Sequence, residues 1–257
     1  MLKLENLSIA IGGKQILHDI NLEIKPGEVH VLFGPNGTGK STLIGAIMGF
    51  SRFEVLSGKI IFNGEDVTNL PVYERARRGI GVMIQRPPTV RGLSVRQLTE
   101  ICADDKGADV DKLAEKMNMT AFLERSVNEG FSGGEIKRSE LLQLMAQQPD
   151  LLLLDEPESG VDLENIALVG GGVNYILERG FDGGQPAPLA KRRAGRKKSG
   201  LIITHTGHIL RYVPADVAHI LYDGSLSCSG NPQEMLECIG NEGYEHCIQC
   251  RIQEGKA

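Results

Sequence analysis

Residues 34–41 combine glycines, a lysine and a hydroxyl side chain at a spacing that suits phosphate chemistry. They read GPNGTGKS, which fits the pattern G-x-x-x-x-G-K-[ST]. In this pattern, glycines let successive backbone N–H groups surround phosphate oxygens, and the lysine neutralises the β- and γ-phosphate charges. A flexible glycine turn is the alternative, but it does not require Gly, Lys and Ser together. We therefore predict ATP or GTP binding by Gly34, Pro35, Asn36, Gly37, Thr38, Gly39, Lys40, Ser41 and Thr42.

Two adjacent carboxylates follow the apolar run at residues 151–154. Asp155 ends that run, and Glu156 is the next residue. A nucleotide site that uses Mg²⁺ needs an acidic side chain after a neighbouring buried strand, so we predict Asp155 and Ser41 as magnesium ligands. Glu156 is placed to polarise the attacking water. A solvated loop is the alternative for two acids standing alone, but the phosphate loop in the same chain favours the catalytic interpretation.

A second group of hydroxyl and glycine residues lies at positions 131–135, which read FSGGE before another predicted helix. The Ser132 hydroxyl and the backbone N–H groups of Gly133 and Gly134 form a second candidate anion site. A Ser-Gly-Gly sequence is more often a helix cap, and on these residues alone that alternative stays open.

Taken together, these motifs resemble those of the ATP-binding cassette (ABC) ATPases, in which the SGGE signature of one subunit completes the nucleotide site of the other. The remaining family elements follow in the family order. Gln85 in VMIQRPP matches the glutamine loop, residues 159–162 match the D-loop, and His205 in IITHT matches the switch histidine. The resemblance implies MgATP hydrolysis in an ATP-dependent head-to-tail homodimer. It implies catalytic roles for Glu156, His205 and Gln85, a place for Gln85 among the magnesium ligands, and a nucleotide site completed by Ser132, Gly133, Gly134 and Asp162.

Strands and helices must place these motifs next to one another. Residues 29–33 predict a buried strand before the phosphate loop, residues 41–50 predict the helix after it, and residues 93–148 carry Leu, Met and Ala at helical spacing. Other strands are predicted near residues 4–11, 20–24, 59–62, 151–155, 201–204 and 219–222. The predicted fold is an α/β ABC ATPase nucleotide-binding domain over residues 1–245. It has a phosphate-loop core, an antiparallel β-subdomain and an inserted helical subdomain at about residues 87–148.

Three further segments resemble SufC, the ATPase family of the Suf iron–sulfur cluster assembly system. They are RSVN at 125–128, GVN at 172–174 and NEGY at 241–244. The resemblance implies that ATP-driven closure changes the shape of a SufB-type scaffold protein, with Pro87 and Pro88 in a loop that faces the partner. The chief alternative is the ATP-hydrolysing subunit of an ABC membrane transporter. A DNA-maintenance clamp would need a coiled-coil insertion or a basic face, and a non-catalytic metal sensor would need functional tail cysteines.

Three features depart from the family pattern. ABC ATPases often place an aromatic residue before the first hairpin turn, but this chain has Ile11, so we predict weak selectivity between ATP and GTP. A glycine- and proline-rich insertion at residues 181–200, strongly basic at 191–198, predicts a mobile loop. It is either a solvated insertion, which we favour, or an electrostatic contact with an acidic partner or nucleic acid. In the tail at 246–257, Cys247 and Cys250 are candidate zinc or iron–sulfur ligands, and reduced thiols on a surface helix are the favoured alternative.

The amino-acid composition and charge disfavour several classes of function. The 257 residues are 41% hydrophobic and 24% charged, as in ordinary soluble domains. The 28 basic and 33 acidic residues give a net charge of −5, which disfavours a dedicated nucleic-acid binder, so no nucleic-acid partner is expected. Apolar runs fall short of the roughly 20 residues that cross a bilayer, so we expect no direct membrane insertion. The odd number of cysteines, 5, and the lack of a secretory leader favour the cytoplasm.

Overall fold

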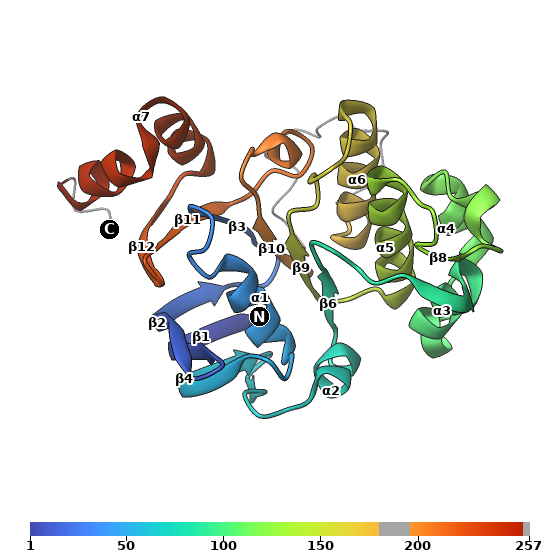
Figure 1. The fold of residues 1–257 in the computed structure, drawn as a ribbon, viewed down its shortest axis with the longest axis horizontal. Helices are drawn as coiled ribbons and strands as arrows, with labels where there is room; N and C mark the ends of the chain where they lie inside the picture. The colour runs from blue at the N-terminus through green and yellow to red at the C-terminus, as the bar shows by residue number, and fades with distance from the viewer. Residues whose placement is uncertain (180–195, 254–257) are drawn as a thin grey trace.

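The fold consists of two main β-sheets, a helical lobe and a long carboxyl-terminal helix (Figure 1). The computed structural model describes residues 1–179 and 196–253. Most of the basic insertion predicted at residues 181–200 therefore lies outside the described residues, as do residues 254–257 of the tail.

An antiparallel sheet with the strand order β2-β1-β4-β5 forms the amino-terminal part. Its strands are β1 (Leu2–Ile11), β2 (Lys14–Ile24), β4 (Glu54–Phe62) and β5 (Glu65–Asp66). Gly12 and Gly13 form the turn between β1 and β2 at positive φ, which glycine adopts without a steric penalty. The three strands that the sequence predicts here are present, and each is longer than its sequence pattern indicates.

A six-stranded sheet with the order β12-β11-β3-β10-β9-β6 carries the sequence motifs. Its strands are β3 (Val29–Phe33), β6 (Ile80–Met83), β9 (Leu151–Asp155), β10 (Ser199–Ile203), β11 (Val217–Tyr222) and β12 (Ser225–Gly230). The neighbours from β11 to β6 pair in parallel. All residues of β3, β9 and β10 are buried, as expected for parallel strands covered on both faces. The segments that follow these strands therefore meet at one edge of the sheet.

Alternate residues of β9 face different layers of the molecule. Leu151 and Leu153 belong to a core shared with the antiparallel sheet and with α1 (Lys40–Met48). Leu152 and Leu154 belong to a second core shared with α5 (Gly133–Gln147) and α6 (Leu163–Ile176). Because successive side chains of a strand point to opposite faces, β9 packs against both layers. The strand that ends in the predicted acidic pair is thus fixed from both sides.

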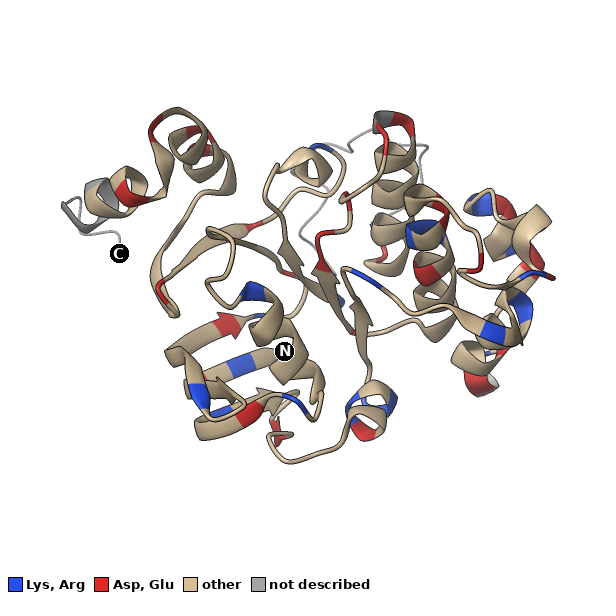
Figure 2. Ribbon diagram, in the orientation of Figure 1, with Lys and Arg blue, Asp and Glu red and all other residues tan. Residues whose placement is uncertain are grey.

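The helical lobe contains α3 (Val95–Ala103), α4 (Val110–Lys116) and α5. It also contains an antiparallel pair, β7 (Val90–Ser94) with β8 (Ser126–Val127). The helical pattern predicted over residues 93–148 corresponds to these three helices, but it did not reveal β8 and the end of β7, because strands this short leave no periodic pattern in the sequence. Figure 2 shows Lys and Arg interspersed with Asp and Glu over the lobe, so charges of both signs are mixed there.

The carboxyl-terminal helix α7 (Pro232–Gln253) is broken at Gly243, whose φ of 85° and ψ of 173° are not helical. The break divides the element into two shorter helical segments. The second segment packs Cys247 into an apolar cluster that includes Val31 and Phe33 of β3 and Ala218 of β11. This contact joins the end of the chain to the central sheet.

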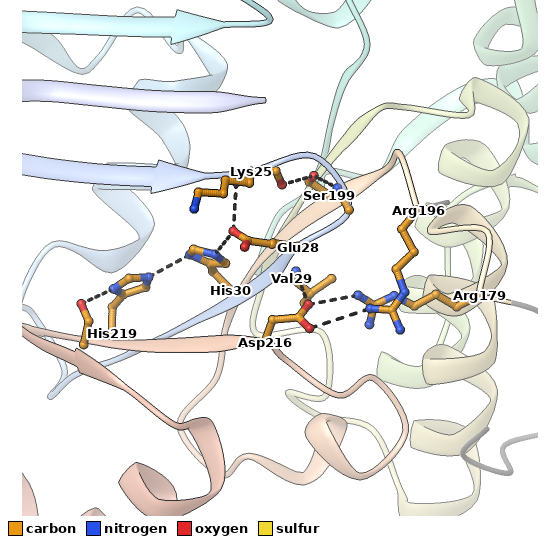
Figure 3. Close-up of polar contacts among 11 residues, drawn as sticks. Lys25, Glu28, Val29, His30, Arg179, Arg196, Ser199, Asp216 and His219 are labelled. Atoms are coloured by element: carbon orange, nitrogen blue, oxygen red, sulfur yellow. Dashed lines mark hydrogen bonds and ion pairs between the residues drawn. The ribbon is translucent and has the colours of Figure 1, made fainter. Parts of the chain in front are cut away.

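Asp216, just before β11, ties together three segments that are distant in the sequence (Figure 3). Its Oδ2 accepts a hydrogen bond from the Val29 backbone N–H at 2.9 Å and lies 3.4 Å from Arg179 Nη2. Its Oδ1 lies 3.8 Å from Arg196 Nη1. Arg179 follows α6 and Arg196 precedes β10, so a single carboxylate anchors the chain on both sides of the undescribed segment 180–195.

Candidate nucleotide site

The phosphate loop joins β3 to α1, and the predicted phosphate-binding residues, Gly34 to Thr42, occupy this loop and the first turn of α1. Lys40, only 6% exposed, donates through Nζ to the carbonyl oxygens of Gly34 at 2.8 Å and Pro35 at 2.7 Å. Burial lowers the pKa of Lys40, whereas the charges of Glu156 and Asp155 raise it. Gly39 is the N-cap of α1 at a φ of 101°, and no described side chain caps the helix there. The helix N-terminus therefore presents backbone N–H groups to an anion.

Asp155 ends β9 and faces the start of α1. Its side chain is 5% exposed, and Asp155 and Ser41 line the same groove. Burial raises the pKa of Asp155, and the Ser41 hydroxyl opposes this effect. Among the described residues, no group hydrogen-bonds to the buried Oδ1 of Asp155. Mg²⁺ prefers oxygen ligands, and an unpaired carboxylate oxygen beside a hydroxyl supplies them. The residues present therefore fit a magnesium ion.

Glu156 lies between two polar side chains that come from neighbouring strands. Its Oε2 accepts a hydrogen bond from Gln85 Nε2 at 2.7 Å, and its Oε1 lies 2.8 Å from His205 Nε2. Gln85 follows β6, Glu156 follows β9 and His205 follows β10, so parallel pairing gathers all three. Glu156 has a φ of 51°, a left-handed conformation that costs a non-glycine residue about 1–3 kcal/mol and is concentrated at functional sites.

A family model described as ABC transporter matches residues 17–159. This chain belongs to the ABC transporter family. It is 36% identical over 260 residues to a probable ATP-dependent transporter of Synechocystis sp., with 95% of this chain and 94% of that protein covered. It is 38% identical over 262 residues to a probable ABC transporter ATP-binding protein of Streptococcus pyogenes, with 97% and 95% covered. It is 36% identical over 257 residues to vegetative protein 296 of Bacillus subtilis, with 95% and 92% covered.

Solved structures of ABC cassettes have the same fold as this ABC ATPase. The ADP conformation of MJ1267, an ATP-binding cassette of an ABC transporter, superposes with a TM-score of 0.71 at 24% identity, covering 97% of this chain and 98% of that one. A nucleotide-free ATP-binding cassette from an ABC transporter gives a TM-score of 0.69 at 21% identity, covering 96% and 98%. The predicted ABC ATPase fold is thus confirmed, and the chain is an ATP-hydrolysing enzyme of this class.

The signature residues of this ABC ATPase lie in the helical lobe, apart from the phosphate loop of the same chain (Figure 1). Ser132 is the N-cap of α5, where its hydroxyl accepts from the Glu135 N–H and Glu135 Oε2 accepts from the Ser132 N–H at 2.7 Å. The helix-cap interpretation therefore holds within one subunit. A Cβ added at Gly133 would lie 2.4 Å from the Gly160 carbonyl oxygen, so the signature packs closely against the D-loop.

Asp162, the D-loop acid, caps α6 and lies on the surface. Its carboxylate accepts hydrogen bonds from the Asn165 backbone N–H at 2.9 Å and from Asn165 Nδ2 at 2.7 Å. It also lines a cavity of about 870 Å³ together with His205 and Glu156. The structure thus gathers Lys40, Ser41, Gln85, Asp155, Glu156 and His205 at the sheet edge, whereas the signature lies elsewhere in the subunit.

A buried carboxylate that was not predicted from the sequence holds the loop around His205. Glu158 is 8% exposed, and its Oε1 accepts hydrogen bonds from the hydroxyls of Thr204 and Thr206, the latter at 3.1 Å. These threonines flank His205 on both sides. Burial raises the pKa of Glu158, and the Thr204 hydroxyl opposes this effect. The signal in the sequence was the Thr-His-Thr triplet, whose hydroxyls require an acceptor if they are buried.

A second missed pair comes from α5 and holds the backbone at the glutamine loop. Lys137 Nζ donates to the carbonyl oxygens of Ile84 at 2.8 Å and Gln85 at 3.3 Å, while the Ile84 N–H donates to Glu140 Oε1 at 3.2 Å. Burial raises the pKa of Glu140 to about 7, although Lys137 lowers it. The helix that carries the signature is therefore bonded directly to the segment that positions Gln85.

A groove of about 1020 Å³ opens beside Gln85. Its walls include Phe50, Phe53, Leu70 and Tyr73, with Arg52, Arg75 and Arg86 as basic residues. Arg75 belongs to α2 (Val72–Arg77) and is occupied internally, because its guanidinium donates to the carbonyl oxygens of Ala46, Ile47, Thr68 and Leu70. The groove thus combines apolar walls with the cations of Arg52, which stacks on the Phe53 ring at 4.5 Å, and Arg86.

One of the two candidate metal ligands of the tail lies in different surroundings from those predicted. Cys247 is completely buried in an apolar cluster, so it is not a surface thiol. The side chain of Cys250 lies outside the described residues. Within the described part of the chain, no group of three or more His, Cys, Asp or Glu side chains is arranged to hold a metal ion. The described helices also include none with the length and apolar character needed to span a bilayer.

Proposed function

We propose that Glu156 orients the attacking water in this ATPase, and that Gln85 and His205 contact the γ-phosphate on either side of it. The observation that supports this most directly is the Glu156 carboxylate itself, which both side chains contact at less than 3 Å. A carboxylate beside the γ-phosphate accepts a hydrogen bond from water and aims its oxygen at phosphorus. When nucleotide binds, the amide and imidazole become available to the phosphate oxygens.

Lys40 and the N–H groups of the phosphate loop are the proposed ligands of the β- and γ-phosphates, with Thr42 beside them. Ser41, Asp155 and Gln85 are the proposed ligands of Mg²⁺. Magnesium bound there supplies positive charge to the phosphate oxygens. The support for this set is the unpaired Asp155 oxygen beside the Ser41 hydroxyl, together with the short bonds of Lys40 inside the loop.

The signature is proposed to act on the second subunit of an ATP-dependent head-to-tail homodimer. Ser132 to Gly134 lie apart from the phosphate loop of their own chain and begin a 15-residue helix, α5. A helix N-terminus attracts anions, so these residues suit a γ-phosphate presented by a partner copy. Asp162 on the adjacent D-loop is proposed to contact the same partner, since Gly133 packs against Gly160.

Replacing Glu156 by Gln tests this mechanism. E156Q keeps the size and the hydrogen-bonding capacity of the side chain but removes its charge. We expect ATP binding to persist, the ATP-bound dimer to accumulate and turnover to fall by about two orders of magnitude or more. The matched control is E100Q, which makes the same exchange at an exposed position on α3. Hydrolysis by E156Q at the wild-type rate would exclude the proposed role.

The groove beside Gln85 is the proposed docking place for a partner whose shape changes with the ATPase cycle. The names of the relatives favour a membrane transporter as that partner, since those of Synechocystis sp. and Streptococcus pyogenes are described as transporter components. In this proposal, the chain is the ATP-hydrolysing subunit and its partner is an integral membrane protein. An amphipathic segment of the partner that carries acidic residues would fit this groove, because the walls are apolar and Arg52 and Arg86 are basic.

A SufB-type scaffold of iron–sulfur cluster assembly is the second candidate partner. The resemblance at residues 125–128 and the proline-bearing loop support it, because the structure joins these two segments. Asn128 Nδ2 donates to the Pro88 carbonyl oxygen at 2.9 Å, and Thr89 Oγ1 donates to the Asn128 carbonyl oxygen at 3.4 Å. A partner bound to the proline loop would therefore act directly on the segment before the signature. The proposed location in both cases is the cytoplasm.

An oxygen-free affinity purification of the intact chain from its native cells separates the two candidates. The chains that co-purify are identified and then added back to measure their effect on ATP turnover. An integral membrane protein that stimulates hydrolysis supports the transporter subunit, and a soluble scaffold that does so supports cluster assembly. Charge reversal in the groove, R52E with R86E, should abolish either effect, whereas R211E, at an exposed arginine between β10 and β11, should not.

A further inference from the structure

The strand β6 lies at one edge of the central sheet, and its pairing with β9 ends where Met83 faces Leu154. Immediately after this point, the backbone is bonded to side chains of α5 instead. The Ile84 N–H donates to Glu140 Oε1 at 3.2 Å, and the Ile84 carbonyl oxygen accepts from Lys137 Nζ at 2.8 Å. Two side chains of a helix therefore replace the neighbouring strand as hydrogen-bond partners of residue 84.

Gln85 is the next residue, and its backbone and side chain have different partners. Its carbonyl oxygen accepts from Lys137 Nζ at 3.3 Å, whereas its Nε2 donates to Glu156 Oε2 at 2.7 Å. The backbone of Gln85 is thus held by α5 while its amide reaches the carboxylate that follows β9. Because the side chain moves with its backbone, a shift at residues 84–85 changes the distance from the amide to Glu156. A misplacement of about 1 Å in a catalytic site can lower a rate by roughly two orders of magnitude.

Lys137 and Glu140 form a buried ion pair three residues apart on α5. Lys137 Nζ lies 3.7 Å from Glu140 Oε2, and the two residues are 2% and 8% exposed. Removal from water penalises both charges, and two apolar side chains of similar volume are often as good for stability or better. What an apolar pair could not provide is the set of hydrogen bonds to residues 84 and 85. The two charges are therefore explained by the backbone that they hold.

We propose that Lys137 and Glu140 are positioning residues for Gln85, which fix the backbone at residues 84 and 85 so that the Gln85 amide reaches Glu156. The inference rests on the proposed function in one respect, namely the role of Gln85 in hydrolysis. Its consequence is a second role for α5. The helix that begins at the signature also holds the glutamine loop of its own subunit.

A double-mutant cycle tests the proposal, because it separates an effect that acts through Gln85 from a general loss of structure. The variant K137M/E140L replaces both charges together, so that neither charge is left buried alone. We expect its kcat to fall by about tenfold, with the Kd for ATP within about twofold of the wild type, because the phosphate loop is unchanged. In a Q85A background, the same double replacement should change kcat by less than about twofold, because the side chain that the pair positions is already absent.

The matched control is K112M/D109N, which removes an exposed ion pair from the start of α4 in the same lobe. Lys112 Nζ lies 2.7 Å from Asp109 Oδ2, the two residues are also three apart, and their side chains are 76% and 49% exposed. Asn at position 109 keeps a side-chain acceptor for the helix cap. This control should leave kcat unchanged. If K137M/E140L does not fold, K137M/E140Q takes its place in the cycle, because Gln keeps the volume of Glu140.

Hydrogen exchange at the Ile84 amide gives a readout that does not depend on turnover. The amide should exchange faster in the pair variant than in the wild type, and at the wild-type rate in Q85A. An equal loss of kcat in the wild-type and Q85A backgrounds, or unchanged exchange at Ile84 in the pair variant, would overturn the proposal. If Q85A hydrolyses ATP at the wild-type rate, the proposed function of Gln85 fails. If Q85A is impaired while the pair variant turns over normally, only the role of Lys137 and Glu140 fails.

Discussion

His30 Nδ1 on β3 lies 2.9 Å from His219 Nε2 on β11, and both imidazoles are buried inside the central sheet (Figure 3). His30 Nε2 lies 3.0 Å from Glu28 Oε2, and His219 Nδ1 lies 2.7 Å from Ser229 Oγ. One proton arrangement satisfies every bond. Ser229 donates to His219, His219 donates to His30, and His30 donates to Glu28. A proton added to His30 Nδ1 would make donors of both facing ring nitrogens, and a proton added to His219 Nδ1 would place a charge inside the buried sheet, so the pair favours the neutral state.

This pair predicts a loss of stability in mild acid. Burial lowers the pKa of His219 to about 3, with the neighbouring His30 adding to the effect. Burial also lowers the pKa of His30, although Glu28 and Asp216 oppose it. Unfolded histidine titrates near 6.5, so below that pH the unfolded chain binds more protons than the folded one. The stability that the neutral His219 contributes to the fold is therefore complete above about pH 6.5 and decreases as the pH falls toward 3.

Urea unfolding at pH 7 and pH 5.5 measures this effect. Between pH 7 and pH 5.5, we expect protonation of His219 in the unfolded chain to lower the free energy of unfolding by about 1 kcal/mol. H219L is less stable at pH 7 because it breaks the chain of hydrogen bonds, but its stability should depend less on pH than that of the wild type. H246L, at an exposed histidine on α7, is the control and should keep the wild-type pH dependence. An equal pH dependence in H219L and the wild type would contradict the assignment.

Glu158 predicts a second measurable effect, on catalysis. Its carboxylate fixes the two threonines around His205, so its loss should misplace the imidazole without touching the phosphate loop. We expect E158L to lower kcat by about tenfold with little change in the KM for ATP, whereas E158Q, which keeps an acceptor oxygen, should recover most of the rate. Steady-state kinetics with E100L as the exposed control checks this. A rise in KM at constant kcat would assign Glu158 to nucleotide binding instead.

The sequence predicted the site best where a particular chemistry requires particular residue types at a fixed spacing. The phosphate loop, the acidic pair after β9, Gln85 and His205 each carry a local pattern, and parallel strands bring such segments to one edge. Contacts between segments that are far apart in the chain leave no local pattern in the sequence. Neither Asp216 at Val29 nor Asn128 at Pro88 follows from spacing, because tertiary packing alone creates these neighbours. The surroundings of Cys247 were mispredicted for the same reason, since its burial depends on contacts with Val31, Phe33 and Ala218 from distant parts of the chain.

The side chain of Ile11 predicts how strongly the site discriminates between ATP and GTP. It ends β1 at 38% exposure, directly before the glycine turn, so an apolar side chain lies exposed where many ABC ATPases have an aromatic one. Stacking of a base on an aromatic ring is worth about 1–3 kcal/mol. We expect the wild type to bind ATP and GTP with similar affinity, and I11Y to bind both more tightly by about fivefold or more, since 1.4 kcal/mol is tenfold. Titration calorimetry with both nucleotides measures this, with L56Y, an aromatic at the exposed Leu56 of β4, as the control. Unchanged affinity in I11Y, together with a strong ATP preference in the wild type, would mean that another element of the site recognises the base.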